Sequence, residues 1–174
     1  MIAILLNDAS FEQDIRELLM AFYPGETFTH KEEEAGEAEL IVRGVRDGNS
    51  FSLDVTPVKK EAVHFALIYP DFSNRFETKN EIKQTLYRLL SAQTGRELPW
   101  GTLTGIRPTK IALTKLYDGW TDEQIETYMR ETYFTSKEKI DLSIDVAERE
   151  RRLLSTIDYE NGYSLYVGIP FCPT

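Results

Sequence analysis

Four copies of one short pattern most strongly constrain how this chain can fold. The pattern is Ser or Thr followed three residues later by Glu or Gln, a pair whose side chains cap the backbone at the start of a helix. It occurs at residues 10–13, 78–81, 121–124 and 135–138, each time just before apolar residues at helical spacing. We therefore expect a helix to begin at each of these four points.

The apolar residues that follow these starts define the buried helix faces. We expect the first helix to end at residues 24–25, the second at Gly95 and the fourth near residue 155. A further short helix is expected over residues 109–117, before the turn at residues 118–119. The side chains expected to face inward are Phe11, Ile15, Leu18, Leu19, Phe22, Ile82, Leu86, Leu89, Leu90, Gln93, Ile125, Tyr128, Met129, Ile140, Ile144, Ala147 and Leu154.

Strand patterns surround the first helix. Residues 2–6 are an apolar run, residues 27–31 and 40–46 are further candidates, and residues 47–49 form a hairpin-type turn. Residues 51–55 alternate apolar and polar, which is typical of a strand with one face in water. Residues 63–69 are apolar at nearly every position, so we expect both faces of that strand to be covered.

The order β-α-β-β-β-β followed by helices predicts an α+β fold. We expect a small mixed or antiparallel sheet with a packed helix over residues 1–74, followed by a helical region over residues 75–160. A chain of 174 residues is long enough to bury a core without disulfide support, and a single cysteine allows no internal disulfide.

The charge of the chain excludes some partners. Its 29 acidic and 20 basic residues give a net charge of −9, which argues against nucleic acids and anionic membranes as main partners. The most acidic run, residues 31–39, is expected to be a solvated turn or sheet edge. The N-terminus lacks a basic region and no apolar run approaches membrane-spanning length, so we expect a cytoplasmic protein without a membrane span.

Two histidines and one glycine-rich segment are the candidates for chemistry before the last strand. His30 and His64 have no metal-ligand spacing around them, and we interpret them as structural or surface residues. The segment LPWGTLTGIRPTKIALTKLY (residues 98–117) places Arg107 ahead of a helix start and Lys110 in its first turn. Free N–H groups and a guanidinium fork predict an anion-binding site at Arg107 and Lys110. The alternative is a structural joint, in which Arg107 pairs with an internal acid.

The C-terminal segment carries the most specific motif. Residues 164–169 are expected to form a strand, and Cys172, the only cysteine, follows directly. The sequence YVGIPFCPT (residues 166–174) resembles the start of the radical S-adenosylmethionine signature Y-x-H-I-P-F-C-x-x-x-C-x-x-C of oxygen-independent coproporphyrinogen III oxidases. Together with PWGTLTGIRPTK (residues 99–110), it resembles the coproporphyrinogen dehydrogenase-like branch of that family.

The resemblance implies cofactors and residue roles. Cys172 matches the first of three cysteines that hold a [4Fe–4S] cluster, and Tyr166 matches a tyrosine that contacts S-adenosylmethionine. Gly168 stands where the oxidases have histidine, which leaves open whether the substrate reaction is the same. The implied activity of the whole protein is oxidative decarboxylation of two propionates of coproporphyrinogen III, in haem biosynthesis. The alternative is a non-catalytic module that recruits a partner or substrate for other porphyrin chemistry.

The resemblance also implies that this chain is a piece of a longer enzyme. Residues 161–174 would begin the radical barrel, and the remaining cluster ligands would lie beyond Thr174. We therefore expect the chain alone to be inactive and to hold neither cofactor. In the full protein, we expect its partners to be its own C-terminal barrel and a porphyrinogen substrate. Without barrel neighbours, the strand at residues 163–169 is expected to fray or to pair elsewhere.

Overall fold

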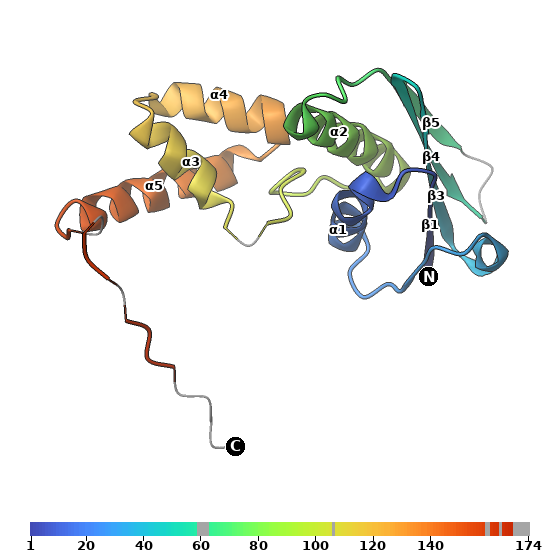
Figure 1. Cartoon of the computed structure of the whole chain (residues 1–174), viewed down its shortest axis with the longest axis horizontal. Helices are drawn as coiled ribbons and strands as arrows, with labels where there is room; N and C mark the ends of the chain where they lie inside the picture. The colour runs from blue at the N-terminus through green and yellow to red at the C-terminus, as the bar shows by residue number, and fades with distance from the viewer. Residues whose placement is uncertain (59–62, 106, 159–160, 164, 169–174) are drawn as a thin grey trace.

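The computed structural model describes residues 1–58, 63–105, 107–158, 161–163 and 165–168 (Figure 1). The strands and helices run in the order β1 (Ile2–Leu6), α1 (Glu12–Phe22), β2 (Phe28–Thr29), β3 (Leu40–Asp47), β4 (Ser50–Pro57), β5 (His64–Ile68), α2 (Arg75–Thr94), α3 (Thr109–Tyr117), α4 (Asp122–Tyr133) and α5 (Lys137–Leu154). Two 3₁₀ turns, η1 (Ala9–Phe11) and η2 (Glu32–Glu37), interrupt the loops. The predicted α+β class is confirmed.

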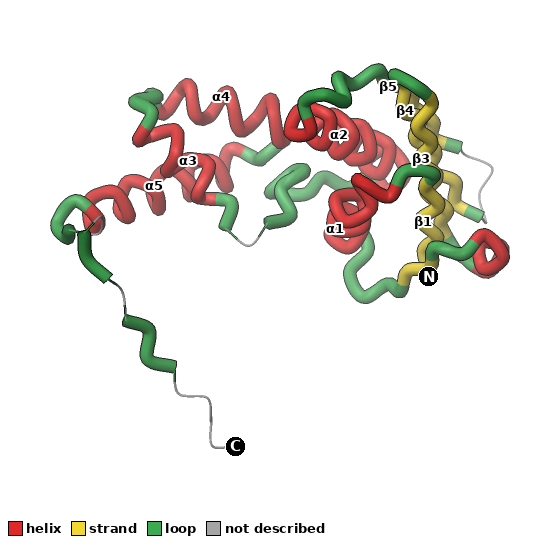
Figure 2. Tube along the Cα trace, viewed as in Figure 1, coloured by secondary structure: helices red, strands yellow, loops and turns green. Residues whose placement is uncertain are grey.

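The five strands form one mixed sheet in the order β2-β1-β3-β4-β5. Strand β1 runs parallel to β2 and β3, whereas β3, β4 and β5 are antiparallel to one another. The predicted turn between β3 and β4 contains Gly48, whose φ of 56° is the left-handed conformation that such a turn requires. The sheet, drawn in yellow in Figure 2, lies at one end of the molecule, and α3, α4 and α5 lie at the other end.

Helices α1 and α2 both cover one face of the sheet. The apolar side chains expected to face inward on these helices form one buried cluster with Ile4, Val42 and Leu53 of the strands. We expected a single helix on the sheet, and α2 joins it because Ile82, Leu86 and Leu90 share one helix face that burial stabilises. A second cluster joins α3, α4 and α5 through Ala112, Ile125, Met129, Ile140 and Ala147. The division at residue 74 remains a prediction.

The other face of the sheet is covered only in part. The turn η2 lies over the β1 side, where Ala35 and Ala38 pack on Ala3. On β5, Phe65 and Leu67 are 60% and 47% exposed, so the expected burial of both faces of this strand is wrong. The error arises because β5 ends the sheet, and an apolar run does not reveal whether its strand is central or at an edge.

A capping box is present at one of the four predicted positions. Thr121 and Gln124 cap each other at the start of α4, as predicted. Helix α5 is instead capped by Ser136, whose side chain accepts from the Lys139 N–H, one residue later than expected. At the first helix, Asp8 caps η1 by accepting from the Ser10 N–H, and α1 continues from that turn without a side-chain cap.

Helix α2 also begins earlier than predicted. Asn74 is its N-cap and accepts from the Glu77 N–H, while the Thr78 hydroxyl donates to the carbonyl of Asp71. Asn and Asp are at least as good N-caps as Ser and Thr. One of them lay close ahead of each of these two helices, which explains why the Ser/Thr pattern misplaced both starts.

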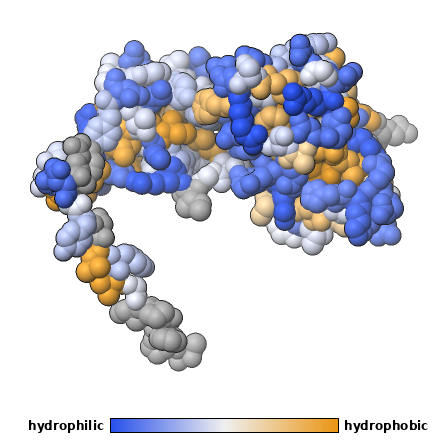
Figure 3. Space-filling view, in the orientation of Figure 1, coloured by the Kyte–Doolittle hydropathy of each residue, from blue (hydrophilic) through white to orange (hydrophobic). Residues whose placement is uncertain are grey.

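The tail beyond α5 shows no strand in its described part. Residues 161–163 and 165–168 form no strand pairing and run away from the helices (Figure 1). Figure 3 shows hydrophobic residues exposed along this segment, and Leu165 and Val167 are 79% and 76% exposed. Ser164 and Ile169, the ends of the expected strand, lie outside the described residues, and the start of a barrel is not seen.

Candidate functional site

The segment from residue 98 to residue 105 joins the two halves of the molecule. Its Gly101 has φ +57°, and a Cβ there would lie 1.9 Å from the carbonyl oxygen of Tyr133. The Thr102 N–H donates to the same Tyr133 oxygen at 2.8 Å, and the Ser136 N–H donates to the Pro99 carbonyl at 2.9 Å. The motif PWGT therefore packs directly against the turn between α4 and α5.

The same segment is tied to the helices that cover the sheet. Lys83 Nζ on α2 donates to Thr104 Oγ1 at 2.9 Å, and that hydroxyl donates to Glu17 Oε2 on α1 at 2.8 Å. Burial lowers the pKa of Lys83, while Asp14 and Glu17 act in the opposite direction. These contacts fix the path of the chain just before Arg107.

A cavity of about 340 Å³ lies beside α3. The residues that line it are Arg107, Lys110, Ile111, Thr114, Lys115, Tyr128 and Tyr133. The structure thus brings Arg107 and Lys110, the two predicted anion-binding residues, to one cavity. Lys115 is a third cation that we did not predict, although its spacing of four residues from Ile111 places both on one face of α3. None of the lining residues is acidic, in a chain of net charge −9.

Arg107 has an internal partner. Its guanidinium forms an ion pair with Glu150, which projects from α5. The structural-joint interpretation requires such a partner, but the Arg107 side chain is 59% exposed, so the pair is not buried. An exposed ion pair contributes little to stability. Arg107 consequently keeps donors that face solvent at the cavity.

Aromatic side chains form the wall of the cavity opposite α3. The rings of Tyr128 and Tyr133 meet edge to face at 5.7 Å, and Trp120 meets Tyr128 at 5.6 Å. Burial, followed by the hydrogen bond between the Tyr128 and Tyr133 hydroxyls, raises the pKa of Tyr133, so its phenol stays neutral near pH 7. Lys115 Nζ lies 4.1 Å from the Trp120 ring centroid and 4.9 Å from that of Tyr128.

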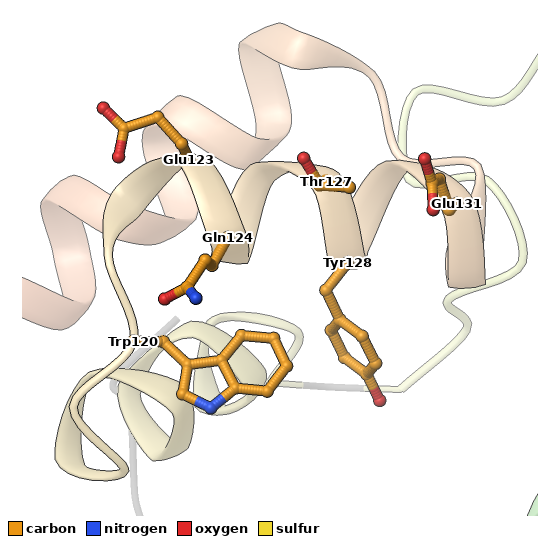
Figure 4. Close-up of a pocket in the computed structure, with 6 residues that line it drawn as sticks. All are labelled: Trp120, Glu123, Gln124, Thr127, Tyr128 and Glu131. Atoms are coloured by element: carbon orange, nitrogen blue, oxygen red, sulfur yellow. The ribbon is translucent and has the colours of Figure 1, made fainter.

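Tyr128 also lines a second hollow, on α4. Figure 4 shows Tyr128 and Gln124 on the same side of α4 as Trp120, with Glu123, Thr127 and Glu131 along the helix. That hollow measures about 460 Å³. Glu123 and Glu131 line that hollow, whereas the charged residues lining the cavity beside α3 are all cations, which favours an anionic ligand beside α3 and not over α4.

The side chains that line the cationic cavity are suited to binding an anion. It offers guanidinium and ammonium donors, two phenols and an apolar floor, which suit a carboxylate attached to a flat or apolar body. His30 lies elsewhere, where its Nδ1 contacts the Ile4 carbonyl at 3.2 Å and its Nε2 lies 3.4 Å from Glu12. No group of three or more His, Cys, Asp or Glu within the described part of the chain could hold a metal ion.

The residues matched to the radical S-adenosylmethionine motif are not assembled into a site. Tyr166 lies in the tail and is 91% exposed, and Cys172 lies outside the described residues. A [4Fe–4S] cluster is held by several thiolates, and this chain has one cysteine in 174 residues. Its own residues therefore do not fit the cluster, and no reaction step can be assigned to them through it.

With this geometry in place, the chain is found to be similar to a known oxygen-independent coproporphyrinogen-III oxidase-like protein. It is 35% identical over 123 residues to the oxygen-independent coproporphyrinogen-III oxidase-like protein HemZ of Bacillus subtilis (strain 168). The similarity covers 68% of this chain and 24% of that protein, so the chain spans about a quarter of its relative. The predicted resemblance to an N-terminal region of such a protein is confirmed.

Other comparisons add no further relationship. No family model matches the chain, and no solved structure matches it. Among the described residues, no helix is both long and apolar enough to cross a membrane.

Proposed function

We propose that this chain is the N-terminal region of a radical S-adenosylmethionine enzyme that oxidises coproporphyrinogen III in haem biosynthesis. Its cavity beside α3 receives a propionate carboxylate of the porphyrinogen. The observation that carries the proposal is the gathering of Arg107, Lys110 and Lys115 around one cavity with an aromatic wall. The similarity to a coproporphyrinogen-III oxidase-like protein supports the class of substrate.

The donor set suits a propionate. A carboxylate can accept two parallel hydrogen bonds from the Arg107 guanidinium, and Lys110 and Lys115 add point charges on the neighbouring helix. The ligand carboxylate competes with Glu150 for Arg107. Because that ion pair is exposed, breaking it costs little free energy. The rings of Tyr128 and Tyr133 lie against the apolar pyrrole plane.

Under this proposal the region binds substrate and performs no chemistry by itself. The whole protein decarboxylates two propionates to give protoporphyrinogen IX, with the cluster and S-adenosylmethionine held mainly by residues outside this chain. Cys172 is its first cluster ligand and Tyr166 a contact to S-adenosylmethionine, as the motif implies. The protein works in the cytoplasm, and its own C-terminal barrel is its principal partner.

A second candidate function is a non-catalytic docking module. The exposed apolar side chains Phe65 and Leu67 on the edge strand β5 favour it, because soluble sheets usually protect such edges. The two candidates use opposite ends of the molecule, so variants can separate them.

The test is binding of coproporphyrin III, the air-stable oxidised form of the substrate, followed by fluorescence on this chain. Arg107→Ala and Lys110→Ala are each expected to weaken binding about tenfold, since each removes a charge-assisted hydrogen bond. Because Arg107 is exposed, its loss should change the free energy of unfolding by less than about 1 kcal/mol. Arg149→Ala, an exposed cation on α5 paired with Asp145, is the matched control.

Equal affinity for the three variants and the unaltered chain would rule out the cavity as the propionate site. A large loss of stability in Arg107→Ala with unchanged affinity would identify Arg107 as a structural joint. Loss of coproporphyrin III binding through Phe65→Lys instead would favour a module that recruits the substrate through β5.

A further inference from the structure

A second cavity, of about 570 Å³, lies where α2 meets the turn between α4 and α5. Its volume is in the range of small-molecule sites, which occur preferentially where two packed units meet. Residues Tyr87, Arg88 and Ser91 of α2 line one side, and Arg130, Thr135 and Lys137 line the other. None of these residues belongs to the cavity beside α3.

Two buried hydroxyl groups at this cavity have no hydrogen-bond partner. Among the described residues, three buried side-chain polar atoms are unsatisfied, and two of them are Ser91 Oγ and Thr135 Oγ1. Thr135 is only 2% exposed. Its hydroxyl does not cap α5, because Ser136 does so. Buried polar groups are nearly always paired, so these two hydroxyls lack the hydrogen-bond partner that most such groups have.

The cations around the cavity are only partly neutralised. The Arg88 guanidinium lies 4.9 Å from the centroid of the Phe134 ring and, within the described residues, has no carboxylate partner. Arg130 and Lys137 share Glu126, at 3.0 Å and 3.4 Å, and Lys137 also contacts Asp141 at 2.9 Å. Glu97 is the one acidic residue in the lining.

The start of α5 adds further donors to the same wall. Ser136 caps this 18-residue helix by accepting from the Lys139 N–H, and Lys137, its first residue, lines the cavity. Helix N-termini present free N–H groups and positive potential to an anion. The floor is apolar, since the rings of Tyr87 and Phe134 pack at 5.5 Å.

We propose that this cavity binds a small aromatic oxyanion, a carboxylate or a phosphate monoester. The guanidinium and the helix N-terminus can only donate, and the two hydroxyls can donate as well as accept, so a ligand that supplies acceptors suits the cavity. Its oxygens lie near Thr135, Ser91 and the start of α5, and its ring lies on Phe134 beside Arg88. This site is independent of the propionate site proposed above, and either can exist without the other.

The experiment is a titration of the isotope-labelled chain with phenyl phosphate and, separately, with benzoate, followed by amide NMR shifts. Saturable shifts are expected at residues 88–91 and 134–138. Arg88→Gln should weaken binding about tenfold, as expected for loss of a charge-assisted contact. The arm that saturates at lower concentration distinguishes a phosphate from a carboxylate ligand.

Thr135 provides the sharper pair of variants. Thr135→Val removes the hydroxyl at nearly constant volume, and it should weaken binding several-fold without lowering the melting temperature, because the hydroxyl has no partner in the unliganded fold. Thr135→Ser keeps the hydroxyl and should retain binding. Arg107→Ala, at the other cavity, should leave these shifts unchanged.

Absence of saturable shifts with both probes would overturn the proposal. Equal affinities for Thr135→Val, Arg88→Gln and the unaltered chain would do the same, as would shifts confined to residues around Arg107.

Discussion

Gly101 shows how the absence of one side chain shapes the joint between the two halves of the molecule. A Cβ at this position would lie 1.9 Å from the Tyr133 oxygen and 2.6 Å from the Phe134 carbonyl, and φ is +57°. Both neighbours are backbone atoms, which cannot turn aside as a flexible side chain can. The glycine is therefore required by the close approach of two chain segments as well as by its own conformation.

Gly101→Ala is expected to lower the free energy of unfolding by about 3 kcal/mol, because overpacking and a strained φ act together. Gly105→Ala, in the same motif, is the matched control, since nothing lies within 4 Å of its added Cβ. Urea unfolding of both variants measures the difference. Similar stabilities for the two variants would show that the joint is not closely packed.

A second prediction at the residue scale concerns Asp8 and the pH dependence of the stability that it contributes. Hydrogen bonds from Ser10, followed by Arg46, lower the pKa of Asp8 from 3.8 to about 2. A folded pKa below the unfolded value means that the ionised carboxylate stabilises the fold above about pH 4 and that this stabilisation is lost as the pH falls toward 2. Asp8→Asn keeps the cap but loses the charge that pairs with Arg46, so it should cost less than about 1 kcal/mol near neutral pH.

The measurement is the unfolding midpoint of Asp8→Asn and of the unaltered chain as the pH is lowered. The two midpoints should converge near pH 2, where Asp8 is protonated. A difference that stays constant over this range would exclude the ionised form as the source of the stabilisation.

At the scale of elements, β5 differs most from expectation. It occupies the end of the sheet, and residues 63–69 contain no charged side chain. Charged residues on edge strands normally prevent pairing between molecules. The open face carries Phe65 and Leu67, which lie opposite Asp54 and Ser52 of β4.

We expect the chain to self-associate as its concentration rises, and Phe65→Lys to reduce that association. Because Phe65 is 60% exposed, the melting temperature should change little. Sedimentation velocity measures the association. Met20→Lys, at an apolar position on α1 that is 50% exposed, is the control. Self-association that survives Phe65→Lys would place the contact surface elsewhere.

At the scale of the whole molecule, the sheet and the helical end are joined and the tail stands apart. The described tail residues follow α5 and run away from the helices (Figure 1). The single cysteine of the chain lies in this tail sequence. One thiolate does not hold a [4Fe–4S] cluster.

Reconstitution of this chain with iron and sulfide should therefore give no stable cluster absorbance and no cleavage of S-adenosylmethionine. Ultraviolet–visible spectra and an assay for 5′-deoxyadenosine provide the measurement. Stoichiometric cluster formation in the monomer would show that other ligands of this chain complete the site.

Local pattern was sufficient for the kinds of element from β1 to α5 and for most of the buried residues. The bounds of α3 and the inward face of α1 follow from spacings of three to four residues, and the capping box at Thr121 lies within one turn. These features depend on backbone periodicity, which neighbouring residues determine. The caps at Asp8 and Asn74 were missed although their residue types allowed them, because two acceptable caps stood close together.

Contacts between distant residues required the tertiary structure. Arg107 could have paired with any of 29 acidic residues, and only the packing of α3 on α5 selects Glu150. Lys115, Tyr128 and Tyr133 meet Arg107 in one cavity because α3 and α4 both pack on α5. Gly101 is essential because Tyr133, 32 residues later, passes beside it. Periodicity places a side chain on a face of its element, whereas the choice of the opposing face depends on the summed burial of the whole core, which no local segment contains.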